Sequence, residues 1–200
     1  MAETSTLRRS PLSHLHDRMI AASVTGDRAV SVTETPFLAQ VSLRVEPGTA
    51  AAARLGTVLG GALPDGVGRT MTAGTLGVAW LGPDELLVVA QADPQSLTAA
   101  LSEALGSDRG AVVDVSANRT VLELSGPGAR SVLEKGCPVD LHPRAFGPGV
   151  AVTTTLGPVP LLLWQTAPAT YRLLPRTSFA DYVARWLVDA MTELGSPEVP

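Results

Sequence analysis

The sequence predicts an α+β protein made of two pseudo-repeated β-α-β-β-α, ferredoxin-like units with antiparallel sheets backed by helices. Short alternating strands joined by Gly-Pro turns are interleaved with amphipathic helices, which favours this class. The order of elements recurs after about 80 residues, too long a period for a solenoid. Leu43–Gly48 in one half corresponds to Leu122–Gly128 in the other. We expect one unit at 37–115 and a second at 116–194.

Residues 1–36 precede the regular pattern and are predicted to form an N-terminal arm. They are polar, lack clear periodicity and end at Pro36, with at most a short helix near 12–22. Such a segment has no core of its own to offset its ordering entropy, so it is either loose or docked on another surface. Residues 195–200 are expected to form a short C-terminal tail.

The first unit alternates strands and helices between clear turn signals. A strand is expected at 37–45, and Glu46-Pro47-Gly48 then opens a helix to residue 59 with proline at its first position. Asp93-Pro94 starts a second helix, which Gly106 stops. Three further strands are predicted, the first two as a hairpin: 75–80, 85–91 and 111–115.

The second unit repeats this order. Gly126-Pro127-Gly128 opens a helix after the first strand, and Ser178 with Asp181 has the spacing of a capping box. Apolar residues at helical spacing then continue to Leu194, which makes this the strongest predicted helix. Four strands are expected in this unit: 119–125, 150–156, 159–166 and 171–174.

Composition excludes several classes of protein. With 45% apolar and 17% charged residues the chain can bury a core, and a net charge of -4 argues against nucleic-acid binding. The longest apolar run, 159–164, is broken by Pro160 and is too short to cross a membrane. The single cysteine, Cys137, and the absence of a signal-like apolar segment predict a cytoplasmic protein.

Polar residues gather at two turns without forming a catalytic set. Asp114, Asn118 and Arg119 flank one turn, whereas His142 and Arg144 lie in a later loop. They suit contact with a partner or a small acid, and the alternative is that Asp and Asn satisfy turn amides while Arg119 pairs with a carboxylate. We therefore predict no catalytic, cofactor-binding or metal-binding residue in this chain.

Two other groups invite a chemical interpretation that their surroundings do not support. His14 and His16 with Asp17 lack a distant further ligand, so we expect an exposed or docked polar segment and no metal site. Cys137 follows Lys135, but no His-Asn pattern supports a nucleophile there. We predict a buried, inert thiol at a helix end.

Several longer runs resemble one known family. They are Arg9–Leu12, Asp114–Arg119, Ser125–Arg130, Leu133–Pro143, Trp164–Thr166 and Ser178–Tyr182. Together they resemble the gamma subunit of heterotetrameric sarcosine oxidase over most of the chain, most weakly between residues 50 and 74. The fold implied by this resemblance is that of the folate-binding part of aminomethyltransferases.

The resemblance implies a non-catalytic subunit that supports assembly of a flavoenzyme with alpha, beta and delta subunits. Such an enzyme oxidatively demethylates sarcosine to glycine, passes the one-carbon unit to tetrahydrofolate and produces peroxide. FAD, FMN, NAD, zinc and tetrahydrofolate would then bind the other subunits and none would bind this chain. The Arg-Thr-Gly-Tyr-Thr-Gly-Glu-Asp run of aminomethyltransferases has no counterpart, and Ala167–Arg172 stands near its expected place.

Two alternatives remain at this point. The chain is either a stand-alone folate-binding or one-carbon-transfer protein of the aminomethyltransferase-like fold, or a homodimer that pairs exposed strand edges. The first alternative requires an apolar cleft between the two halves with a few converging polar groups. Asp114, Asn118 and Arg119 are the residues we would expect to converge there.

Overall fold

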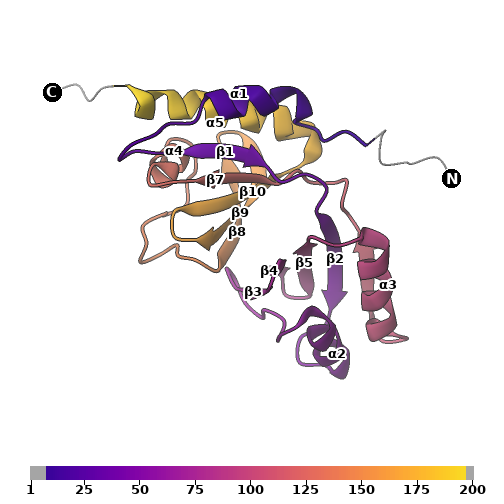
Figure 1. Ribbon diagram of the computed structural model, residues 1–200. Coiled ribbons are helices and arrows are strands. Elements are labelled where there is room, and N and C mark those ends of the chain that lie inside the picture. Colours follow the sequence, from indigo (N-terminus) through magenta and orange to yellow (C-terminus); the bar gives the residue numbers. More distant parts are fainter. Residues whose placement is uncertain (1–7, 197–200) are drawn as a thin grey trace.

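The computed structural model describes residues 8–196 and contains two five-stranded sheets. The first seven residues of the predicted arm and the last four of the predicted tail lie outside the described residues. All strand pairs in both sheets are antiparallel, as the sequence predicted. Figure 1 shows the two sheets lying between two groups of helices.

One sheet has the order β3-β4-β5-β2-β6 and is backed by two helices. Its strands are β2 (Ala39–Val45), β3 (Thr70–Ala73), β4 (Leu76–Gly82), β5 (Glu85–Ala90) and β6 (Gly110–Asp114). The helices are α2 (Ala50–Leu59) and α3 (Pro94–Leu105). We call this assembly the β2 unit.

The other sheet has the order β1-β7-β10-β9-β8. Its strands are β1 (Ser31–Glu34), β7 (Leu122–Ser125), β8 (Val150–Leu156), β9 (Val159–Ala167) and β10 (Thr170–Pro175). The helices packed on it are α1 (His16–Ala21), α4 (Ala129–Glu134) and α5 (Ala180–Thr192), with single 3-10 turns at Ser13–Leu15, Thr177–Phe179 and Glu193–Gly195. We call this assembly the β7 unit.

Strand alternation divides the core into three parts. Successive side chains of a strand point to opposite faces, so each sheet buries one face under its helices and another against the second sheet. In β9, for example, Leu161 and Leu163 pack under the helices, whereas Leu162 and Trp164 belong to the cluster between the sheets. The layers therefore run helix, sheet, sheet, helix.

Trp164 is the largest side chain in the cluster between the two sheets and is 2% exposed. It lies directly over Gly77 of β4, where an added Cβ would come within 2.2 Å of the indole Cη2. The ring thus occupies the space of a missing side chain. The space between the halves, where the folate-binding alternative requires a cleft, is filled core at this position.

The N-terminal segment is docked, which is one of the two alternatives expected for it. Leu12, Leu15 and Met19 are buried in the core of the β7 unit, and β1 pairs with β7 along Ser31–Glu34. The surface on which the segment docks belongs to the same chain, about 100 residues further along, which local pattern does not reveal.

The strand β3 was missing from the predicted first unit. It is an edge strand that pairs only with β4, is half-buried, and follows a glycine-rich loop, so its period-two signal is weak. Each unit therefore runs β-α-β-β-β-α, so the β-α-β-β-α order was one strand short. The missing strand is in the first unit, because the four strands expected in the second unit correspond to β7, β8, β9 and β10.

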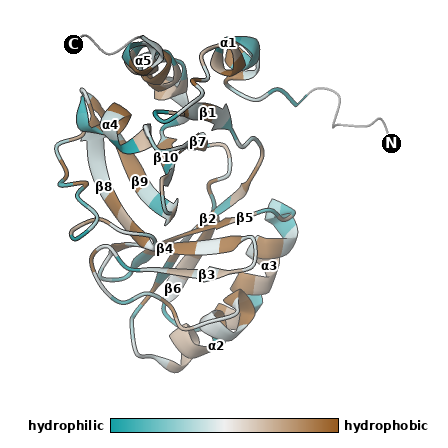
Figure 2. Cartoon of the chain, turned by 60° about the vertical axis from the view of Figure 1, so that its left-hand side comes forward, coloured by the Kyte–Doolittle hydropathy of each residue, from teal (hydrophilic) through white to brown (hydrophobic). Residues whose placement is uncertain are grey.

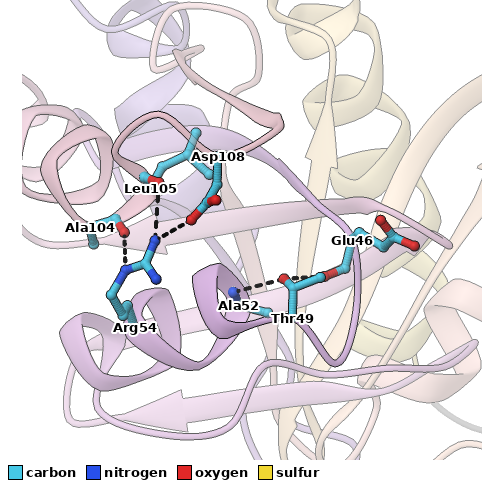
Figure 3. A network of polar contacts seen from close by, with 7 residues as sticks. All are labelled: Glu46, Thr49, Ala52, Arg54, Ala104, Leu105 and Asp108. Carbon is cyan, nitrogen blue, oxygen red and sulfur yellow. Dashed lines mark hydrogen bonds and ion pairs between the residues drawn. The ribbon is translucent and has the colours of Figure 1, made fainter.

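Two predicted helix starts also need correction. Helix α2 begins at Ala50 behind an N-cap at Thr49, whose Oγ1 accepts from the amide of Ala52 (3.2 Å), so Pro47 is not in the helix (Figure 3). Ser178 does not cap α5, because it lies inside a 3-10 turn and the helix has no side-chain cap. Asp181 instead accepts from Arg185 and His14.

Helices α2 and α3 are joined by Arg54, as Figure 3 shows. Its Nε donates to the carbonyl of Ala104 (2.9 Å), and its Nη2 donates to the carbonyl of Leu105 (3.2 Å) and to Asp108 Oδ2 (2.5 Å). The last carbonyls of a helix have no partner within the helix. Arg54 supplies that partner and neutralises the negative end of α3.

Candidate functional site

The segment between β6 and β7 carries the polar residues that stood out in the sequence, and it connects the two sheets. We call residues 115–121 the crossover. Asp114 closes its first turn, because Asp114 Oδ1 accepts from both the amide (2.9 Å) and the hydroxyl (2.5 Å) of Ser116. This is the local hydrogen bonding that Asp typically makes in turns. Asp114 thus shapes the crossover.

The far half of the crossover is anchored to the end of β10. Asn118 Oδ1 accepts from Arg176 Nη1, and the Asn118 carbonyl accepts from the amide of Thr177 (2.9 Å). Thr177 Oγ1 also donates to the carbonyl of Ala117 (2.8 Å). Asn118 therefore holds the crossover against the strand that precedes α5.

Gln40 of β2 was not among the predicted site residues, yet it is the buried centre of this region. It is 2% exposed. Its backbone N–H donates to Ser116 Oγ (3.0 Å), and its side-chain Nε2 donates to the carbonyl of Arg119 (2.8 Å). A polar residue alternating with Val41 in a strand normally predicts a solvent face. Only the packing of the second unit over that face buries it.

Arg119 is half-buried, and its side chain makes one described hydrogen bond, from Nη1 to the carbonyl of Leu174 at 3.4 Å. Burial lowers the pKa of its guanidinium, neighbouring Arg176 lowers that pKa further, and Glu85 opposes both effects. The expected pairing of Arg119 with a carboxylate is not among the described contacts. A guanidinium offers five N–H donors, so most of its capacity remains for a further acceptor.

A cavity of about 460 Å³ opens beside the crossover. We call it the junction cavity, because its lining comes from the N-terminal segment, from β2 and from the crossover. Asp114 and Arg119 line it, whereas Asn118, His142 and Arg144 are not among its lining residues. The lining consists of Arg8, Arg9, Pro11, Glu34, Thr35, Pro36, Phe37, Leu38, Gln40, Pro94, Asp114, Ser116, Ala117, Arg119, Thr120, Val121 and Thr177.

His142 and Arg144 lie in the exposed loop between α4 and β8. The amide of His142 donates to Asp140 Oδ1 (2.9 Å), and the amide of Arg144 donates to His142 Nδ1 (3.2 Å). Within residues 8–196 no described hydrogen bond or ion pair joins this loop to Asp114, Asn118 or Arg119. The two predicted clusters are therefore separate.

The other candidate groups, His14 and Cys137, contact residues of the folded chain. His14 Nε2 lies 2.7 Å from Asp181 Oδ1 and links the N-terminal segment to α5. Cys137 is half-buried rather than buried, and its Sγ lies 3.9 Å from Thr154 Oγ1. Among the described residues no group of three His, Cys, Asp or Glu side chains could hold a metal ion. Nor does that part of the chain contain a helix long and apolar enough to span a membrane.

Chemically, the region around the crossover offers hydrogen-bond acceptors, arginines and apolar contact surface. It is suited to binding through shape and charge. Two serine hydroxyls in this region donate to carboxylates, Ser116 Oγ to Asp114 Oδ1 (2.5 Å) and Ser10 Oγ to Glu34 Oε2 (2.5 Å).

Comparison with known proteins gives one consistent result for the whole sequence. The model of the sarcosine oxidase, gamma subunit family matches residues 44–193. The sarcosine oxidase gamma subunits of Corynebacterium sp. (strain U-96) and Arthrobacter sp. are 47% and 48% identical to this chain over 201 residues. Each alignment covers 100% of this chain and 97% of the relative.

Two solved structures resemble this chain in fold. A chain in the heterotetrameric sarcosine oxidase from Corynebacterium sp. U-96, in complex with pyrrole 2-carboxylate, is 47% identical and superposes with a TM-score of 0.93. That match covers 97% of this chain and 100% of the other. Aminomethyltransferase T of the glycine cleavage system from Bartonella henselae superposes with a TM-score of 0.67 at 15% identity, over 91% of this chain and 57% of that one. This second likeness concerns the fold alone.

Proposed function

The chain belongs to the sarcosine oxidase, gamma subunit family, and on that premise we propose that it is the non-catalytic gamma subunit of a heterotetrameric sarcosine oxidase. The observation that supports this proposal most strongly is the match to a chain of such an enzyme, at 47% identity and a TM-score of 0.93 over 97% of this chain. Its role is to support assembly of the complex. The polar residues of the crossover fit this role, because most of their described hydrogen bonds fix the backbone of the crossover and of the strand ends next to it.

The partners in this proposal are the alpha, beta and delta subunits. FAD, FMN, NAD, zinc and tetrahydrofolate bind those other subunits, where sarcosine is oxidatively demethylated to glycine with transfer of the one-carbon unit to tetrahydrofolate and production of peroxide. The complex resides in the cytoplasm, which the single cysteine of this chain supports. The exposed Asn118, His142 and Arg144, together with Asp114 and Arg119, are proposed contact residues for partners.

We also propose that the β2 and β7 units are pseudo-repeats. Both run β-α-β-β-β-α, and their sheet orders correspond strand by strand from β3-β4-β5-β2 to β8-β9-β10-β7. The fifth strand occupies the same edge in both, although β6 follows its unit and β1 precedes its unit. This support concerns topology and is independent of the proposed activity.

The stand-alone folate-binding alternative has less support. The likeness to an aminomethyltransferase rests on 15% identity, which carries the fold and no ligand. The space between the halves is filled where Trp164 lies over Gly77, and Asn118, one of the residues expected to converge in a cleft, does not line the junction cavity. We therefore do not propose a folate site in this chain.

The proposal is tested by the mass and absorbance of the complex that a tagged copy recovers from its native cytoplasm. We expect a large flavin-containing assembly that oxidises sarcosine, whereas the purified chain alone has no flavin absorbance and no turnover. Recovery of the chain only as a monomer or homodimer would contradict the proposal. In a second test, loss of reduced-folate binding by Asn118→Ala and Arg119→Ala, with assembly intact, would favour the folate-binding alternative.

A further inference from the structure

A cavity of about 810 Å³ extends along α2, between this helix, the loop after it and the β4–β5 turn. We call it the α2 cavity. Its lining reaches from Thr49, before the helix, to Gly60, after it, and consists mainly of small and apolar residues. Ala53, Thr57 and Ala62 in the lining are exposed, so a group from outside the chain can enter. An apolar cavity of this size is a normal place for a ligand or for a side chain of a partner.

The loop after α2 packs on the helix through its backbone. Gly60 ends the helix with φ +86°, and the amide of Gly61 then donates to the carbonyl of Gly56 (2.9 Å). A Cβ added at Gly56 would lie 2.7 Å from the Gly61 carbonyl oxygen, so no larger residue fits at this contact. At this wall of the cavity the chain therefore supplies backbone in place of side-chain volume.

The β7 unit fills the corresponding space with aromatic rings. Its strand β10 has Tyr171 as second residue, facing the helices, and the corresponding strand β5 has Leu86 in the same place. Phe146, from the loop after α4, is 2% exposed and stacks on Tyr171 with 6.4 Å between the ring centroids. The loop after α2 contains no aromatic residue, and Leu86 lines the α2 cavity. The cavity therefore lies where the other unit has a packed ring.

Most polar groups around the α2 cavity are already engaged. The hydroxyls of Thr49 and Thr57 both donate to backbone carbonyls, at 2.8 and 3.0 Å. Asp84 accepts from Arg44 (3.3 Å), whereas Asp65 has no hydrogen bond or ion pair among the described contacts of residues 8–196. The lining contains no basic side chain. A small ligand would find few groups to orient it, and the free carboxylate of Asp65 favours a cation nearby.

We propose that the α2 cavity is a socket for an aromatic side chain of another subunit of the complex, with a basic residue of the same segment beside Asp65. The ring packs on Leu86 and takes the place that Phe146 has in the β7 unit. Aromatic residues and arginine are the usual anchors of protein interfaces, and they bind in pockets of this kind. This inference rests on the proposed function and on the correspondence of the two units, since it identifies one surface through which the subunit assembles.

Two substitutions test the socket, each with a matched control. Ala53→Phe places a ring in the cavity from α2, and Ala99→Phe places the same ring on the exposed surface of α3, outside the cavity. Asp65→Asn removes the free carboxylate, and Asp189→Asn removes another at an exposed position of α5. All four residues are exposed, and no described hydrogen bond involves their side chains. The free chain should therefore keep its stability in every variant.

The measurement is the fraction of tagged chain recovered in the flavin-containing assembly when variant and wild type compete in the same cells. We expect about tenfold less incorporation for Ala53→Phe, because a filled cavity excludes the ring of the partner. Asp65→Asn should lower incorporation by at most about fivefold, because an exposed ion pair is weak. Ala99→Phe and Asp189→Asn should incorporate like wild type. The free Ala53→Phe chain should unfold at the same or higher denaturant concentration than wild type, which separates docking from folding.

Several results would overturn the socket. If wild type assembles and Ala53→Phe incorporates as well as Ala99→Phe, the inference is wrong while the proposed function stands; failure of wild type to assemble removes the proposed function itself. Equal incorporation of Asp65→Asn and Asp189→Asn would remove the basic residue from the inference.

The other possible occupants of the α2 cavity give different results. If the purified wild-type chain forms a homodimer, by sedimentation, that Ala53→Phe abolishes, the cavity binds a second copy of this chain and the inference is wrong. Mass spectrometry of the denatured assembly covers a small ligand. A compound that is released from wild type and absent from Ala53→Phe would assign the cavity to that ligand instead of a partner side chain.

Discussion

The β7 unit and the β2 unit complete the same arrangement of strands from opposite directions along the chain. The β2 unit takes its fifth strand, β6, from residues that follow α3, whereas the β7 unit takes β1 from the N-terminal segment. The β7 unit also buries more, since its helix-facing core contains 25 buried residues, against 11 in the β2 unit. The N-terminal segment contributes five of the 25: Leu12, Leu15, Met19, Val30 and Val32.

The β2 unit correspondingly leaves more surface open. The α2 cavity, of about 810 Å³, lies between the loop after this helix and the β4–β5 turn. Among residues 8–196, the β2 unit has no third helix that corresponds to α1 of the β7 unit. Figure 2 shows α2 and α3 beyond the β2-unit sheet and α1, α4 and α5 beyond the other. The difference teaches that two units of one topology can have unequal cover, and that a remote segment supplies part of it in the β7 unit.

The largest expected effect comes from the core that joins the two units. Trp164→Ala should lower the free energy of unfolding by about 3–5 kcal/mol, because a buried indole between the sheets is replaced by a void. Chemical denaturation of the whole chain measures it. Phe179→Ala is the control, since its ring is 42% exposed and should cost well under half as much. A cost below about 1 kcal/mol for Trp164→Ala would mean that the units are not coupled through this cluster.

The contribution of the N-terminal segment is the next largest. Met19→Ala should cost about 2–5 kcal/mol, because Met19 is 2% exposed in the core of the β7 unit. Leu55→Ala in the β2 unit is the matched substitution, at a fully buried position under its sheet. Denaturation of both variants should give similar losses. If Met19→Ala is nearly neutral while Leu55→Ala is costly, the segment is a removable arm and the comparison of the two cores fails.

Gly77→Ala tests the close contact of the sheets from the other side. The added methyl would lie 2.2 Å from Trp164, so we expect a loss of about 1–3 kcal/mol through overpacking. Gly66→Ala is the control, because its nearest contact, at 3.6 Å from Arg69 Cγ, is ordinary. Adding Trp164→Phe to Gly77→Ala should recover part of the loss. Failure of the smaller ring to recover any stability would place the strain elsewhere.

The smallest effect concerns the ion pair that ties the N-terminal segment to α5. Hydrogen bonds from Arg185 and then His14 lower the pKa of Asp181 below its usual value. A carboxyl whose pKa is lower in the folded state contributes stability above its unfolded pKa of about 3.9, and loses it as pH falls through the folded pKa. Asp181→Asn should therefore be destabilising at pH 7 and match wild type in strong acid.

The size of this effect is limited, because Asp181 and His14 are each about half exposed. We expect less than about 1 kcal/mol at pH 7, and less still in 1 M salt. Denaturation from pH 7 to pH 2 measures the difference between the variant and wild type. A difference that persists unchanged in strong acid would assign the loss to packing instead of charge.

Local patterns in the sequence predicted much of the fold. Antiparallel sheets backed by helices followed from alternating runs such as 37–45 and from the turn signals around them, because those signals depend on neighbouring residues alone. The helix of 180–192 was evident from its apolar stripe, although its start was not. The prediction that Ser178 caps this helix was wrong, because Ser178 lies within the 3-10 turn that precedes the helix.

The candidate site was predicted in part. Asp114, Asn118 and Arg119 were singled out because several polar residues in one short segment are conspicuous in any sequence. The structure brings Asp114 and Arg119, but not Asn118, to one cavity, and their role as partner contacts stays a prediction. Gln40 was missed, since an alternating polar residue in a strand looks solvent-exposed until another sheet covers it. The α2 cavity was missed because the helix and the glycine-rich loop that line it border a cavity only once the chain has folded.

The sequence by itself determined most strands and helices and the crossover, but not β1 or β3, since these elements depend on periodicity and turn chemistry over a few residues and the signals of β1 and β3 are weak. Tertiary structure alone decided that β1 pairs with β7, that Trp164 lies over Gly77, and that Leu86 borders an open cavity. The physical reason is the range of the interactions. Hydrogen-bonded turns act between neighbours, whereas burial and cavities depend on surfaces that meet only after residues far apart in the chain have packed together.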